Sequence, residues 1–146
     1  MATVAPAFRK LEIGTKLPEY VRTVSQEDII RMGLASHDCN PVHMNPEWAR
    51  RARVFGTEST VAHGMMTMGF LVSLVTAWIH PVGGWLRAME SKFTRPVLPG
   101  ETITSRGVVI ELHYMGREED FVVIAVEAVN QKGEPVAVGK ARVVIP

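Results

Sequence analysis

The sequence of 146 residues contains little cysteine, little excess charge and no very long hydrophobic run. Its single cysteine, Cys39, cannot close an internal disulfide, so no such bond stabilises the fold. Sixteen Lys and Arg residues against fifteen Asp and Glu residues leave a formal charge of +1. No run of basic residues provides the electrostatic surface of a nucleic-acid-binding protein, and we expect no nucleic-acid partner.

The longest apolar segment spans about residues 64–79 and is shorter than the roughly 20 residues of a membrane-spanning helix. It also contains Thr67, Ser73 and Thr76. We interpret it as a buried helix and expect no membrane partner. Residues 1–14 lack the apolar core of a signal peptide, so we expect a cytoplasmic location.

The hydrophobic content, in contrast, is ample. At 47% it lets a chain of this length bury one core without disulfides or metals, which predicts a single domain over residues 1–146. Pro6, Gly14 and Pro18 interrupt the first part of the chain, so residues 1–18 are expected to form an irregular N-terminal arm.

Three segments carry helix signals. Ser25 followed by Asp28 resembles a capping box and predicts a helix of about three turns over residues 25–36. Asn45 and Pro46 predict a second helix over residues 45–52, and the intervening HDCNPVH is expected to be a loop. Residues 63–80 are apolar on nearly every side, as expected for a helix enclosed by other structure.

Segments rich in Val and Ile, separated by turn residues, follow the long helix. They predict an antiparallel meander in the second half of the chain, and a further short strand is expected over residues 19–25. A buried helix with a long-stranded sheet is an α+β arrangement in which the sheet wraps the helix. The four strand segments of the meander are residues 85–97, 101–115, 120–131 and 134–146.

Two motifs resemble the linked signatures of the MaoC-like, (R)-specific enoyl-CoA hydratase family. Residues 36–49, SHDCNPVHMNPEWA, contain Asp-x-Asn-Pro-x-His, and residues 61–70, VAHGMMTMGF, contain Ala-His-Gly-Met. The resemblance extends from about Leu11 to the C-terminus, although His37 stands where the family usually has glycine. It implies a hot-dog domain, an antiparallel sheet wrapped round one long central helix, with the active site at a subunit interface. The implied assembly is a homodimer or a higher homo-oligomer, and a heterodimer is possible.

The resemblance also implies a reaction, the reversible hydration of a trans-2-enoyl thioester of coenzyme A or acyl carrier protein. Hydration needs a base that takes a proton from the attacking water and an acid that protonates the α-carbon. The resemblance implies that Asp38 and His43 are these two residues. The sequence leaves open which of them is the base. Gly64, at a helix start, can offer an unpaired amide to the developing enolate, and Asn40 would fix the loop that holds the pair.

Asn40 is also a candidate for substrate binding, and further candidates lie in the second motif. Met65 and Met66 could line an acyl channel because methionine adapts to flexible chains, and Met68, Phe70 and Leu71 could join them. Ordinary core packing is the alternative for each. Five cationic residues are candidates for binding coenzyme A phosphates: Arg50, Arg51, Arg53, Lys92 and Arg95. Solvated surface charge is the alternative for each of them.

Other roles remain open for the histidine, aspartate and cysteine residues in and near the two motifs. His37, Asp38, His43 and His63 offer metal-binding groups, but their spacing matches no metal signature, so we expect no metal and no cofactor. For His63 we instead expect a structural hydrogen bond that anchors the helix start. Cys39 is expected to be a small buried thiol, since the adjacent Asp38 disfavours a thiolate.

Two rival functions also remain. A thioesterase on the same fold commonly uses an acidic residue on the central helix, and residues 63–80 contain no Asp or Glu. A structural or acyl-binding subunit of a heterodimeric dehydratase is the other rival, although the complete pair of Asp38 and His43 favours the catalytic subunit.

Overall fold

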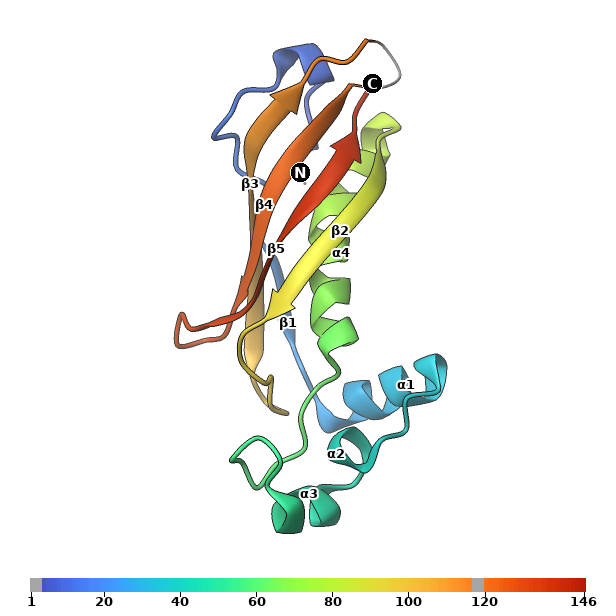
Figure 1. Cartoon of the computed structure of the whole chain (residues 1–146), viewed down its shortest axis with the longest axis vertical. Helices are drawn as coiled ribbons and strands as arrows, with labels where there is room; N and C mark the ends of the chain where they lie inside the picture. The colour runs from blue at the N-terminus through green and yellow to red at the C-terminus, as the bar shows by residue number, and fades with distance from the viewer. Residues whose placement is uncertain (1–3, 117–119) are drawn as a thin grey trace.

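The computed structural model describes residues 4–116 and 120–146, in which a five-stranded antiparallel sheet packs on one long helix (Figure 1). Helix α4 lies along the sheet, and the three other α-helices gather beyond its N-terminal end. The α-helices are α1 (Gln26–Ser36), α2 (Pro41–Met44), α3 (Pro46–Ala52) and α4 (Gly64–Ile79). The strands are β1 (Tyr20–Thr23), β2 (Trp85–Phe93), β3 (Thr102–His113), β4 (Phe121–Val129) and β5 (Pro135–Val144). This is the hot-dog α+β fold expected from the sequence.

The order of strands in the sheet is β1-β3-β4-β5-β2. Strands β3, β4 and β5 follow one another as a meander, as predicted. The prediction is wrong for β2, which pairs with β5 from Trp85↔Val144 to Phe93↔Ala137. The place beside β3 is taken by β1, with Tyr20 opposite Ser105. Strands β1 and β2 are therefore the two edges of the sheet.

Helix α4 buries one side against the sheet. The buried side contains Leu71, Leu74 and Trp78, spaced as successive turns of one helical face. Gly107 in β3 permits the close approach, because a β-carbon there would lie 3.2 Å from Ile124 Cγ2 and 3.4 Å from Leu74 Cδ2. The core of the domain thus lies between α4 and the inner face of the sheet.

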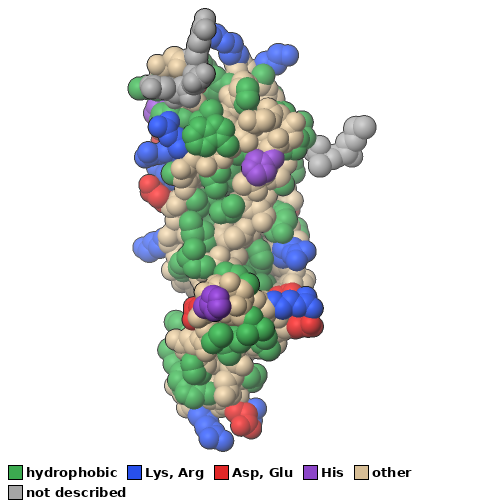
Figure 2. Space-filling model, turned by 90° about the vertical axis from the view of Figure 1, so that its right-hand side faces the viewer, with side chains coloured by type: hydrophobic (Ala, Val, Ile, Leu, Met, Phe, Trp, Pro, Cys, Tyr) green, Lys and Arg blue, Asp and Glu red, His purple; other side chains and the backbone are tan. Residues whose placement is uncertain are grey.

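The other side of α4 is left uncovered by the part of the chain that the structure describes. Met65 and Ala77 are exposed, and Val72 and Thr76 are only half-buried. Figure 2 shows hydrophobic side chains along this side of the molecule. The sheet therefore covers one side of the helix that was expected to be enclosed by other structure, and it leaves the opposite side accessible. Within the described residues, Gly64–Val82 is long and apolar enough to cross a membrane, but its packing in the core identifies it as the central helix of the domain.

Two local predictions also need correction. Residues 4–18 are irregular except for the short 3-10 helix η1 (Phe8–Lys10), yet Phe8, Leu11 and Leu17 are buried in the core. The arm is therefore an integral part of the packing. The expected loop HDCNPVH ends in a helix, α2, because Asn40 caps it and Pro41 suits its first position. A second 3-10 helix, η2 (His80–Val82), continues α4.

Candidate active site

Asp38 is positioned by the end of α1. The helix begins with the predicted cap, in which the Ser25 hydroxyl oxygen accepts from the Asp28 amide and the Asp28 carboxylate accepts from Ser25. It ends at His37, whose φ of 59° and ψ of 18° are left-handed. Glycine adopts this conformation most easily, so His37 holds a backbone conformation that its β-carbon disfavours. The turn places the Asp38 carboxylate, whose side chain is 54% exposed, beyond the helix end.

His43 is positioned by α2. Asn40 begins that helix, with its side-chain oxygen accepting from the Val42 amide at 3.1 Å. The Gln26 side chain donates to the His43 carbonyl at 2.9 Å and ties α2 to α1. The Val42 carbonyl accepts from the Val61 amide, which joins α2 to the segment before α4. Asn40 therefore fixes the segment that carries the pair, as predicted, by capping its helix.

Asp38 and His43 face each other across a short gap. His43 Nδ1 lies 2.7 Å from the Val61 carbonyl oxygen, which can only accept, so Nδ1 carries the proton. In neutral His43 this leaves the lone pair on Nε2, which lies 3.9 Å from Asp38 Oδ2. That distance is too long for a direct hydrogen bond, but a water molecule could lie about 2.8 Å from both atoms. The two side chains are thus arranged to hold one water.

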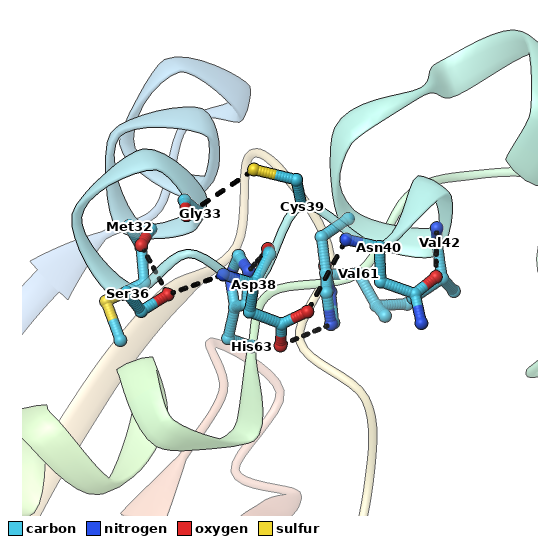
Figure 3. Close-up of polar contacts among 10 residues, drawn as sticks. Met32, Gly33, Ser36, Asp38, Cys39, Asn40, Val42, Val61 and His63 are labelled. Carbon is cyan, nitrogen blue, oxygen red and sulfur yellow. Dashed lines mark hydrogen bonds and ion pairs between the residues drawn. The ribbon is translucent and has the colours of Figure 1, made fainter.

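His63 links this pair to the start of α4. Its Nε2 donates to the Asp38 carbonyl oxygen at 2.9 Å, and its ring stacks on that of His43 with centroids 3.9 Å apart. His63 is 2% exposed. The predicted structural hydrogen bond is confirmed, and its partner is the backbone of Asp38. Figure 3 shows Asp38 between His63 and the end of α1.

The three side chains also form a group of possible metal ligands. One ligand-type atom each from Asp38, His43 and His63 lie within 4.8 Å of one another. The two imidazoles stack with centroids 3.9 Å apart and planes at 27°, however, so their lone pairs lie in nearly parallel, separated planes and cannot meet at one nearby point. A zinc ion needs its ligands directed at a common centre about 2.0 to 2.3 Å away. The arrangement suits acid–base chemistry better than metal binding.

A cavity of about 380 Å³ opens beside this group. His43 and Gly64 line it, together with apolar walls formed by Phe55, Phe93 and Val97. Gly64 is the first residue of α4, and a β-carbon there would lie 2.8 Å from the Phe93 ring. Glycine is therefore required both for access to the helix start and for the Phe93 contact. The cavity brings the N-terminus of α4 next to His43, one member of the predicted pair.

The predicted binding residues lie in different places. Met65 is 60% exposed and Met66 packs against the core. Neither is among the described residues that line this cavity, so their role in acyl binding stays a prediction. Cys39 is exposed, with its Sγ donating to the Gly33 carbonyl at 3.7 Å, so the prediction of a buried thiol is wrong (Figure 3).

Of the five cationic candidates, only Arg95 lines the cavity. Its guanidinium lies 3.5 Å from the Glu134 carboxylate. A hydrogen bond from Asn130, together with the Arg95 cation, holds the pKa of Glu134 below its usual range. The other four cations are exposed, and Arg53 pairs with Glu58.

Sequence reasoning missed several residues that line the cavity, among them Phe55, Phe93 and, in the first turn of α4, Thr67. No local pattern marks the two aromatic residues, because their positions depend on how β2 and the segment after α3 meet α4. Thr67 had a usable signal, since it lies three residues after Gly64 and therefore on the same helical face.

Comparison with known proteins identifies the family of the chain. Residues 10–132 match the model of the family described as MaoC like domain. The (R)-specific enoyl-CoA hydratase of Rhodospirillum rubrum is 31% identical over 125 residues, which are 86% of this chain and 82% of that protein. The mitochondrial 3-hydroxyacyl-[acyl-carrier-protein] dehydratase of Arabidopsis thaliana is 36% identical over 93 residues, which are 64% of this chain and 52% of that protein.

Solved structures agree as well. The R-hydratase PhaJ1 from Pseudomonas aeruginosa, in its unliganded form, superposes with a TM-score of 0.84 at 26% identity. The match covers 96% of this chain and 85% of that one. The family expected from the two motifs is confirmed. The chain therefore belongs to the MaoC-like family and to the hydro-lyase class of its hydratase and dehydratase relatives.

Proposed function

We propose that the chain catalyses the reversible hydration of trans-2-enoyl thioesters to (R)-3-hydroxyacyl thioesters carried by coenzyme A or acyl carrier protein. The observation that carries this proposal is the 3.9 Å gap between Asp38 Oδ2 and His43 Nε2 beside a cavity that begins at Gly64. The hydratase and dehydratase relatives support it.

The pair would act on one water molecule. In the hydration direction, the water oxygen bonds to the β-carbon of the enoyl group while its proton passes to one member of the pair. The α-carbon then receives a proton from the acidic member. The lone pair on His43 Nε2 and the exposed carboxylate of Asp38 both point at the same gap, so either can accept the first proton.

Negative charge moves to the thioester oxygen as the water attacks. The amide of Gly64, at the positive end of the α4 dipole, would donate a hydrogen bond to this oxygen. The apolar walls would exclude bulk water and hold the acyl group in an environment where this hydrogen bond is strong.

We also propose that the working form is a homodimer. The uncovered apolar side of α4 and the free edge of β2 lie on the same side of the molecule (Figures 1 and 2). A second copy would cover both of them. A partner subunit of different sequence is the alternative, and activity of the purified chain alone would argue against it.

The test is hydration of crotonyl-CoA, followed by the loss of absorbance of the conjugated double bond. Asp38→Asn and His43→Gln should each lower turnover by about 10² to 10⁴ if the pair performs acid–base catalysis. Cys39→Ser is a matched control, because its side chain is exposed and adjacent to Asp38 in sequence.

Folded Asp38→Asn and His43→Gln proteins with near-normal turnover would contradict the proposed roles. Release of thiol from saturated acyl thioesters, in the absence of hydration, would instead favour a thioesterase. A panel of enoyl thioesters of increasing length, on both carriers, would define the substrate.

A further inference from the structure

Thr67 is a buried polar residue in an apolar part of the cavity. It lies in the first turn of α4, is 3% exposed, and lines the cavity together with Gly64 and His43. The neighbouring walls are mainly apolar side chains such as Phe55 and Phe93. A valine of almost the same shape would fill this position without burying a hydroxyl.

The hydroxyl of Thr67 makes no hydrogen bond to any residue that the structure describes. Other threonines of the chain behave differently: Thr76, also in α4, donates to the Val72 carbonyl at 2.9 Å, and buried Thr60 donates to Gln26. Its oxygen is not among the buried unpaired side-chain atoms of the described residues, which are His63 Nδ1 and Ser105 Oγ, so it keeps access to the cavity that Thr67 lines. A hydroxyl that faces a cavity is free to donate to a ligand bound there.

The position of Thr67 in the helix indicates which ligand atom this would be. Residues three apart share one helical face, and their Cα–Cβ bonds tilt toward the helix N-terminus. The Thr67 side chain therefore extends toward the turn that begins at Gly64. Thr67 and Gly64 both line the cavity, and they do so from the first turn of the same helix.

We propose that Thr67 is a further catalytic residue, whose hydroxyl donates a second hydrogen bond to the thioester oxygen beside the bond from the Gly64 amide. This inference rests on the proposed hydratase function. When water adds to the β-carbon, the electron pair of the double bond moves through the carbonyl onto that oxygen. The Thr67 hydroxyl keeps its proton throughout, and the charge returns to the α-carbon when the acid protonates it.

The test compares Thr67→Val, which removes the hydroxyl at nearly constant shape, with Thr67→Ser, which keeps it. Crotonyl-CoA hydration and thermal unfolding are measured on both variants and on the wild type. Because the hydrogen bond strengthens as charge develops, Thr67→Val should lower kcat by about 100-fold with little change in KM. Thr67→Ser should stay within about fivefold of the wild type, because the donor remains.

Thermal unfolding separates this role from a structural one. If the hydroxyl has no protein partner, Thr67→Val keeps or raises Tm while activity falls. Wild-type turnover in Thr67→Val overturns the inference and leaves the proposed function intact. A fall of Tm in Thr67→Val, with equal activity loss in both variants, also overturns it. Absence of turnover in the wild type overturns the proposed function itself and this inference with it.

Discussion

At the scale of single residues, His37 adopts a backbone conformation that carries a stability cost. Its φ of 59° is left-handed, which costs a residue with a β-carbon about 1 to 2 kcal/mol, whereas glycine loses roughly 0.5 to 1 kcal/mol in chain entropy. His37→Gly should therefore raise the free energy of unfolding by about 0.5 to 1 kcal/mol, measured by urea denaturation.

His37→Ala is the control, since it removes the imidazole but keeps the β-carbon. Its free energy of unfolding should stay below that of His37→Gly. Equal values for the two variants would contradict the left-handed conformation as the cause.

The residues of the site were predictable only in part. Asp38 and His43 are five positions apart, so a motif could identify them, and His63 lies within the second motif. The Val61 carbonyl that sets the tautomer of His43, and the Phe93 ring that covers Gly64, reach the site through packing between distant segments. Sequence spacing carries no information on such contacts.

At the scale of elements, α1 depends on its cap, and α1 in turn positions Asp38. Hydrogen bonds from the Ser25 hydroxyl and amide hold the pKa of Asp28 below its ordinary value of 3.8. Removing the hydroxyl with Ser25→Ala should lower the free energy of unfolding by about 1 kcal/mol at neutral pH.

The effect of this cap should depend on pH. A carboxylate with a lowered pKa stabilises the folded state above about pH 3.8, and this contribution is lost as pH falls through the lower, folded-state pKa. The difference in free energy of unfolding between wild type and Ser25→Ala, measured by urea denaturation, should become smaller as the pH is lowered. A difference that stays constant at every pH at which the protein folds would show that the charge of Asp28 does not contribute.

The elements themselves were predicted where a local pattern is strong. Asn45 and Pro46 predicted α3, and the same pair of residue types at Asn40 and Pro41 begins α2, so the signal for α2 was present. The pairing of β2 with β5 was not predictable. Strand order depends on long-range contacts, and the eight residues between β2 and β3 are consistent with either a hairpin or a crossing connection.

At the scale of the whole molecule, α4 has an apolar side that none of residues 4–116 and 120–146 covers. A helix that is apolar nearly all round is expected to be buried, yet Met65 and Ala77 are exposed. The adjacent strand β2 is an edge, with backbone groups available for pairing. These features lead us to expect a particle of two chains in solution, measurable by light scattering.

A charge on the uncovered side of α4 should dissociate this dimer. Ala77→Glu places a carboxylate that is solvated in the monomer but would be buried at the contact between two chains. Ala35→Glu is the control, because it places the same charge on the exposed surface of α1. Ala77→Glu should shift the mass to one chain and lower hydration activity, since the active site is expected at the interface. Ala35→Glu should remain dimeric. A wild-type mass of one chain, or an Ala77→Glu dimer as stable as the wild type, would refute α4 as the contact.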